Sequence, residues 1–275
     1  PRPGKCRTHP NSSCFNMAGN LHYEERGNPS NPVLVFLHGL LGSSRNWRSV
    51  SKVLSEKFHT VSFDLPNHGQ SFHQDTCTVN TMAEDISLCL DRLGFHKFSI
   101  CGHSLGGKVA MRLACDFPKA VDQLIVVDIA PRTYPAEHHL PTLTALLDLE
   151  LSKIESRKEA DHALTEKIPN WAFRQFLLTN LEMKNGVLTW LPNLQILRRS
   201  IQFLSANPLQ STDQFSGPSL FIRGGKSGYV RNEHFQEIKK YFPEAQIETL
   251  ANAGHDLHVE DREGFLSSIG AFLKV

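Results

Sequence analysis

The sequence predicts one large α/β domain in which a mostly parallel sheet is covered by helices on both faces. Short apolar runs, rich in β-branched or aromatic residues, have the character of buried strands. They occupy residues 33–38, 60–64, 98–103, 123–128 and 219–223. Helical patterns separate them, and apolar strands that alternate with helices are typical of a parallel sheet. The length of 275 residues is enough for a sizeable core.

The helices between these strands are predicted from apolar residues at helical spacing. Residues 81–94 place Met82, Ile86 and Leu90 on one face. The spacing of Thr81 and Glu84 predicts a capping box at the start of this helix, and Gly94 predicts its end. Similar stripes run through residues 47–58 and 265–272.

Residues 131–215 interrupt the alternation, because they contain helical patterns without a convincing buried strand. The alternation resumes with residues 219–223 and 246–250. We therefore expect a core formed by residues 17–130 and 216–275, with residues 131–215 inserted as a helical cap over the end of the sheet.

Residues 1–16 show neither periodicity nor the apolar core of an intact secretory signal. We expect an N-terminal extension here, with Met17 as the natural start. The alternative is a processed transit-peptide remnant, because the stretch contains basic residues and no acidic one.

Composition excludes several classes of function. The 29 basic and 28 acidic residues give a net charge of +1, which argues against a nucleic-acid-binding face. No apolar run is long enough for a membrane span. The six cysteines form no CxxC pair, so we expect no metal or redox site, and Cys89, Cys101 and Cys115 should be small core residues. A reducing compartment fits this usage: the cytoplasm of a bacterium, or a mitochondrion in an animal.

The strongest chemical signal is Gly102-His103-Ser104-Leu105-Gly106, which follows a predicted strand and precedes a helix. A G-x-S-x-G sequence in this context is typical of a strained turn that presents a nucleophilic serine, and the context argues against a chance match. The backbone N–H groups of Leu40 and Leu105 are the expected donors to the oxyanion, while His38 should brace its loop.

A serine hydroxyl needs a base, and His255 follows the predicted strand 246–250 on the same sheet edge. His258 is the alternative base, although it should lie at the start of the last helix. His138 and His139 are expected to be solvated cap residues. Asp64 and His68 follow another strand, and we expect a structural role for their loop.

These motifs resemble those of the α/β-hydrolase superfamily, over about residues 20–275. The resemblance depends on HGLLGS, DLPNHGQS, GHSLGG and AGHDLH, in this order. GHSLGGKVAM, VVDIAP, RQFLLTNL and FIRGGKSGYV are most similar to the esterase group that contains the bacterial YbfF-type esterases and the animal abhydrolase-domain-containing protein eleven. The resemblance implies an eight-stranded sheet, a helical cap and hydrolysis of carboxylic or thio esters without a cofactor.

The position of the catalytic acid is unusual. Most of the superfamily has an acid near the place of Ser227, but no Asp or Glu lies between Lys226 and Arg231. Asp128 ends the neighbouring predicted strand, within plausible reach of the imidazole, and the esterase group has its acid after the same strand. We predict that Asp128 orients His255. The alternative for Asp128 is a structural role, in which its side chain caps the backbone where the chain enters the helical insertion. Because Ser227 carries no charge, Ser227→Ala should have little effect.

The substrate should lie between the sheet edge and the cap. Residues that would line an apolar acyl site, or else form the core of the cap, are Leu41, Phe173, Phe176, Leu177 and Trp190. A small-molecule ester with a short to medium acyl chain is the expected partner, and the protein should be a monomer or homodimer. The alternatives are a carbon–carbon bond hydrolase, a cofactor-free haloperoxidase and a non-enzymatic ligand receptor.

Overall fold

The computed structural model describes residues 13–16 and 19–274. Its main sheet has eight strands. In spatial order they are β1 (Ser13–Asn16), β2 (Gly19–Arg26), β4 (His59–Phe63), β3 (Val33–Leu37), β5 (Phe98–His103), β6 (Val121–Val127), β9 (Ser219–Gly224) and β10 (Ala245–Leu250). The β1–β2 and β2–β4 pairs are antiparallel, and every pair from β4 to β10 is parallel.

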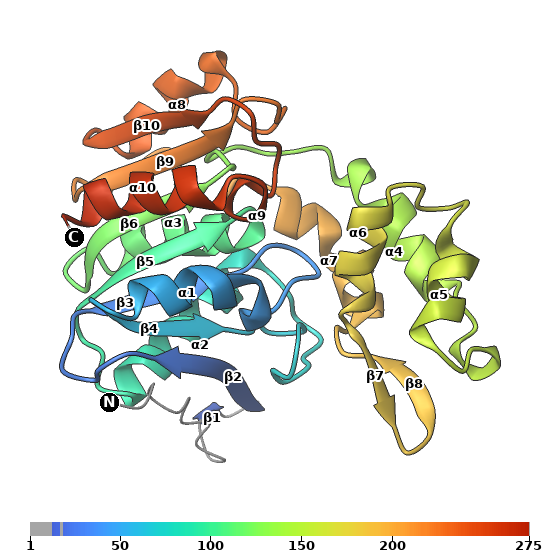
Figure 1. The fold of residues 1–275 in the computed structure, drawn as a ribbon. Helices are drawn as coiled ribbons and strands as arrows, with labels where there is room; N and C mark the ends of the chain where they lie inside the picture. Colours follow the sequence, from blue (N-terminus) through green and yellow to red (C-terminus); the bar gives the residue numbers. More distant parts are fainter. Residues whose placement is uncertain (1–12, 17–18, 275) are drawn as a thin grey trace.

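Helices cover both faces of this sheet, because the apolar strands point side chains to both sides. Leu34 and Phe36 of β3 pack into one core and Val35 and Leu37 into the other. The first core includes α1 (Arg48–Leu54) and α10 (Arg262–Leu273), which lie in front of the sheet in Figure 1. The second core includes α2 (Val79–Arg92), α3 (Leu105–Asp116) and α8 (Phe235–Tyr241).

The segment between β6 and β9 forms the cap, which lies to one side of the sheet in Figure 1. Its longer elements are α4 (Leu140–Leu147), α5 (Arg157–Leu164), α6 (Trp171–Leu178), α7 (Leu194–Ser205) and a hairpin of β7 (Leu181–Lys184) and β8 (Val187–Trp190). Asn180 Nδ2 of the cap donates to the carbonyl of Leu41 at 2.7 Å, and Asn193 N–H to that of Asn67 at 3.0 Å. The predicted mostly parallel eight-stranded sheet with helices on both faces and a helical cap is confirmed.

Some details differ from the sequence-based expectations. The capping box of α2 joins Thr78 to Thr81, so the predicted box at Thr81 is wrong by one helical turn. Gly94 has a φ of +78°, which fits the predicted helix end. The sequence pattern did not indicate β1 or β2.

The predicted extension and Met17 lie mostly outside the described residues; Ser13–Asn16 forms the edge strand β1. Cys101 is a free, buried thiol, and Cys115 is free and half-buried. Cys89 is buried but disulfide-bonded, which its sequence context did not predict. Within the described part of the chain, no helix has the length and apolarity that crossing a membrane requires.

Candidate active site

Ser104 occupies the sharp turn between β5 and α3. Its backbone has φ +50° and ψ −114°, a strained conformation for a residue with a side chain. The Ser104 N–H donates to the carbonyl of Val127 on the neighbouring strand at 3.0 Å. The turn thus sits where the carboxyl ends of β5 and β6 meet.

The glycines around Ser104 allow this turn because the backbones approach too closely for a side chain. A Cβ on Gly102 would lie 2.2 Å from the carbonyl oxygen of Gly106. A Cβ on Gly106 would lie 2.4 Å from the carbonyl oxygen of Leu37. The spacing of G-x-S-x-G is therefore a packing requirement between β3, β5 and α3.

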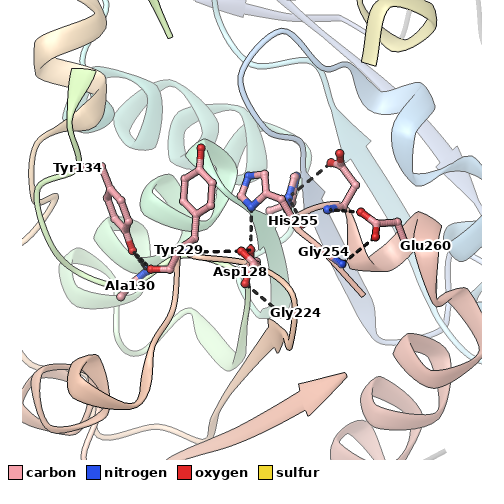
Figure 2. Close-up of polar contacts among 11 residues, drawn as sticks. Asp128, Ala130, Tyr134, Gly224, Tyr229, Gly254, His255 and Glu260 are labelled. Carbon is pink, nitrogen blue, oxygen red and sulfur yellow. Dashed lines mark hydrogen bonds and ion pairs between the residues drawn. The ribbon is translucent and has the colours of Figure 1, made fainter. Parts of the chain in front are cut away.

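His255 lies in the loop between β10 and α9 (Leu257–Glu260). Its Nδ1 lies 2.8 Å from Oδ2 of Asp128, and Figure 2 shows the two side chains facing each other. The Asp128 side chain is fully buried, while 28% of the His255 side chain is exposed. When Nδ1 donates to the carboxylate, Nε2 is the nitrogen that carries the free lone pair.

The backbone around His255 is held by contacts that the sequence did not indicate. The carboxylate of Glu260 accepts from the N–H of Gly254 at 2.7 Å and from that of Asp256 at 3.3 Å (Figure 2). Nε2 of His103 lies 3.0 Å from the carbonyl oxygen of His255. These contacts fix the loop on both sides of the histidine.

Asp128 follows β6 with a φ of +49°. Its Oδ1 accepts from the N–H of Gly224 at 3.0 Å, and its Oδ2 also accepts from the hydroxyl of Ser227. A buried carboxylate is costly unless such donors compensate for lost water. The turn after β9 therefore contacts the carboxylate directly, so we revise the expectation that Ser227→Ala has little effect.

Tyr229, which the sequence analysis missed, packs against the imidazole. Its ring lies 3.9 Å from that of His255, with 17° between the planes (Figure 2). The Tyr134 hydroxyl donates to the carbonyl of Tyr229 at 2.9 Å and accepts from the N–H of Ala130 at 3.0 Å. Burial and the carboxylate of Asp128 raise the pKa of Tyr229. The ring therefore stays neutral beside the histidine.

The alternative base, His258, lies in α9 and is buried. Its ring stacks on Trp47 at 4.6 Å, and its Nδ1 has no hydrogen-bond partner among the described residues. Burial lowers the pKa of His258 to about 3, so it is neutral near pH 7. This environment is that of a core residue.

The loop that follows β3 is braced as expected. The Leu65 N–H donates to Nε2 of His38 at 2.9 Å, and Nδ1 of His38 lies 2.7 Å from the carbonyl oxygen of Gly39. Asp64 accepts from the backbone N–H groups of Ser44 and Gln70, at 2.6 and 2.8 Å. His68 is fully buried beside these residues. These hydrogen bonds link the loop after β3 to the loop after β4.

Two hollows meet at Ser104. The larger has a volume of about 640 Å³ and is lined by His255, Leu41, Phe173 and Phe176, among others. The smaller has a volume of about 30 Å³. Its walls contain Ser104, Leu105, Lys108, Ile129, Tyr134, Ile201, Leu204, Ser205 and Tyr229, among others. Leu40 lines both hollows.

Two of the expected lining residues lie elsewhere. Leu177 is fully buried and Trp190 packs half-buried against the core, and neither lines a hollow at Ser104. Conversely, the expectation that His138 and His139 are both solvated is wrong for His139, which is half-buried and lines both hollows. Burial and the nearby His255 lower the pKa of His139 to about 4.

Comparisons with known proteins agree with this fold and identify the family. A family model described as alpha/beta hydrolase fold matches residues 32–262. A mouse protein named sn-1-specific diacylglycerol lipase ABHD11 is 37% identical over 254 residues, which cover 90% of this chain and 82% of that protein. Esterase YbfF of Escherichia coli is 29% identical over 244 residues, covering 89% and 94%. A solved marine microorganism esterase is 33% identical, with a TM-score of 0.89 and coverage of 92% and 98%.

Proposed function

Because the chain belongs to the α/β-hydrolase family, we propose that it is a serine carboxylesterase whose catalytic triad is Ser104, His255 and Asp128. The observation that carries this proposal is the 2.8 Å contact between His255 Nδ1 and Asp128 Oδ2, beside a hollow that also contains Ser104. Esterase and lipase names among the relatives support an ester hydrolase.

In the acylation step, Nε2 of His255 accepts the proton of the Ser104 hydroxyl while Oγ bonds to the ester carbonyl carbon. Asp128 holds the ring in the required tautomer and stabilises the imidazolium that forms. The carbonyl oxygen becomes an oxyanion, which the N–H groups of Leu40 and Leu105 stabilise. Leu105 is the first residue of α3, so the positive end of the helix dipole favours the same negative charge.

Collapse of the tetrahedral intermediate breaks the bond to the leaving oxygen. The imidazolium of His255 gives its proton to that oxygen, and an acyl-enzyme remains on Ser104. His255 then removes a proton from water, which attacks the acyl carbon to form a second tetrahedral intermediate. Its collapse breaks the bond to Ser104 Oγ, which takes the proton back from the imidazolium, and the acid leaves. Protein groups supply every proton transfer, so this mechanism needs no cofactor.

Esters with short to medium acyl chains are the proposed substrates, with thioesters as a second leaving-group type. The apolar side chains of Leu41, Phe173 and Phe176 support an uncharged substrate. Diacylglycerol, which the name of the mouse relative specifies, belongs among the substrates to be tested.

The proposal is tested with p-nitrophenyl esters of rising acyl length and a diacylglycerol. Ser104→Ala should lower kcat by up to about 10⁶-fold, as loss of the nucleophile does in other serine hydrolases. Ser211→Ala, at an exposed serine, is the matched control and should retain full activity. Wild-type protein that hydrolyses none of these esters, or activity that survives Ser104→Ala, would contradict the proposal.

A further inference from the structure

We infer that the two hollows at Ser104 divide the substrate, with the acyl chain in the smaller one and the leaving alcohol in the larger. Ile201 and Leu204 of α7 would then limit the length of the acyl chain. This inference rests on the proposed ester hydrolysis and assigns the two halves of its substrate.

The position of His255 gives the two hollows different roles. Ser104, Leu40, His139 and Tyr229 line both hollows, so the hollows meet at the nucleophile. Among the described residues, His255 lines the larger hollow and is absent from the wall of the smaller one. The base therefore faces one half of the site.

The chemistry of the second proton transfer assigns each half. The leaving oxygen must receive its proton from Nε2 of His255, so the leaving group has to lie on the side of that ring. The carbonyl carbon is bonded to Ser104 Oγ at the junction of the hollows. Its acyl substituent then points away from His255, into the smaller hollow.

The size of the smaller hollow restricts what it can hold. A volume of about 30 Å³ has room for about two to three water-sized groups, which corresponds to acyl chains of about two to four carbons. Ile201 and Leu204 lie three residues apart on α7, so they share the face that forms the cap-side wall. Ile129, which follows β6 in the core, also lines this hollow.

This wall is tied to the helix that begins beside the nucleophile. Nζ of Lys108, one turn after Ser104, donates to the carbonyls of Ser205 and Ala206 at 2.6 and 2.7 Å. The Tyr134 N–H also donates to the carbonyl of Ser205, at 2.9 Å. The end of α7 is therefore fixed relative to Ser104, which keeps the smaller hollow narrow.

The larger hollow has a different boundary. Phe173 is 38% exposed and Val259 64% exposed, and both line it. Its volume of about 640 Å³, against about 30 Å³ for the smaller hollow, gives a bulky alcohol room beside side chains of α6 and α9. The structure thus favours short-chain esters of large alcohols.

The test varies one half of the ester at a time. One series keeps p-nitrophenol and changes the acid among acetate, butyrate and octanoate; the other keeps acetate and changes the alcohol among ethyl, benzyl and 1-naphthyl. Wild-type protein should prefer butyrate to octanoate in kcat/KM by at least about tenfold, the scale expected for methylenes that do not fit a pocket.

Variants on the two sides should act on different series. Ile201→Ala and Leu204→Ala should each shift the butyrate-to-octanoate ratio about tenfold toward octanoate. Ile201→Phe should narrow the smaller hollow and raise the preference for acetate over butyrate. A general loosening of the fold cannot lengthen the accepted acyl chain in one variant and shorten it in another. Phe173→Ala, the control on the other side, should change the alcohol series and leave the acyl ratio unchanged. Thermal unfolding of each variant verifies that it is folded.

Three results would overturn the inference. Wild-type protein that hydrolyses octanoate as fast as butyrate would show that α7 does not limit the acyl chain. If Phe173→Ala changed the acyl series and Leu204→Ala changed the alcohol series, the acyl chain would belong to the larger hollow and the alcohol to the smaller one. Absence of Ser104-dependent hydrolysis on every ester is a separate result, which overturns the proposed function and the inference together.

Discussion

The turns after β6 and β9 contribute different groups to the environment of His255. The turn after β6 supplies a carboxylate, Asp128, and the turn after β9 supplies the Gly224 N–H, the Ser227 hydroxyl and the Tyr229 ring. The strands are parallel neighbours, with Val127 paired to Ile222. All these groups therefore converge on Asp128 or His255, although they are about 100 residues apart in sequence.

In the proposed site, the acid belongs to the turn from which a carboxylate can contact the imidazole, and this need not be the turn after β9. Neighbouring strands lie about 4.8 Å apart, so side chains at two strand ends can approach the same imidazole. The turn after β9 (residues 224–229) carries no carboxylate, but its Gly224 N–H and Ser227 hydroxyl stabilise the carboxylate of Asp128.

Asp128→Asn should lower kcat by about 10⁴-fold, because an amide can hold the imidazole in the wrong tautomer. The measurement is kcat for p-nitrophenyl acetate. Asp122→Asn, at an exposed aspartate on the same strand, is the matched control and should be silent. A loss below about tenfold in Asp128→Asn would mean that another group orients His255.

The double variant Asp128→Asn with Ser227→Asp moves the carboxylate to the turn after β9. The Ser227 hydroxyl already contacts Asp128 Oδ2, so a carboxylate at 227 should reach the same region. We expect recovery of about tenfold in kcat over Asp128→Asn alone, within the range of coupling energies between contacting residues. If kcat did not recover, a carboxylate at position 227 could not replace the one at position 128, even though both side chains lie in the same region.

Ser227→Ala should lower kcat by about tenfold and lower Tm, because a hydrogen bond to a charged group contributes about 1.5–3 kcal/mol. Ser227→Thr keeps the hydroxyl and serves as the control. Kinetics and thermal unfolding measure the two effects. An unchanged kcat and Tm would return Ser227 to the minor role that the sequence suggested.

Tyr229→Leu should have the smallest effect, about two- to tenfold in kcat, in line with about 0.5–1.5 kcal/mol for a pair of aromatic rings. Tyr229→Phe keeps the ring and should stay close to wild type. Equal losses in Tyr229→Leu and Tyr229→Phe would show that the hydroxyl, not the stacking, matters.

Local patterns made much of the molecule predictable. Strand runs, G-x-S-x-G and an acid at a strand end are contained in a few consecutive residues, so the parallel strands of the sheet and the proposed triad could be named from sequence, whereas β1 and β2 could not. The contacts of Ser227, Tyr229 and Glu260 could not, because each depends on which loops meet in space. The sequence also did not show which side chains of α6 face the site. Adjacent residues of this helix point in different directions, so Phe176 lines the larger hollow while Leu177 is fully buried.

The close approach at Gly102 and Gly106 has a consequence for protein engineering. Because a methyl group at either position would overlap a carbonyl oxygen, a saturation library there should yield almost no active clones except those that restore glycine. Diversity aimed at new specificity is better placed at Ile201 and Leu204 of α7 and at Phe173 and Phe176 of α6, whose side chains line the hollows.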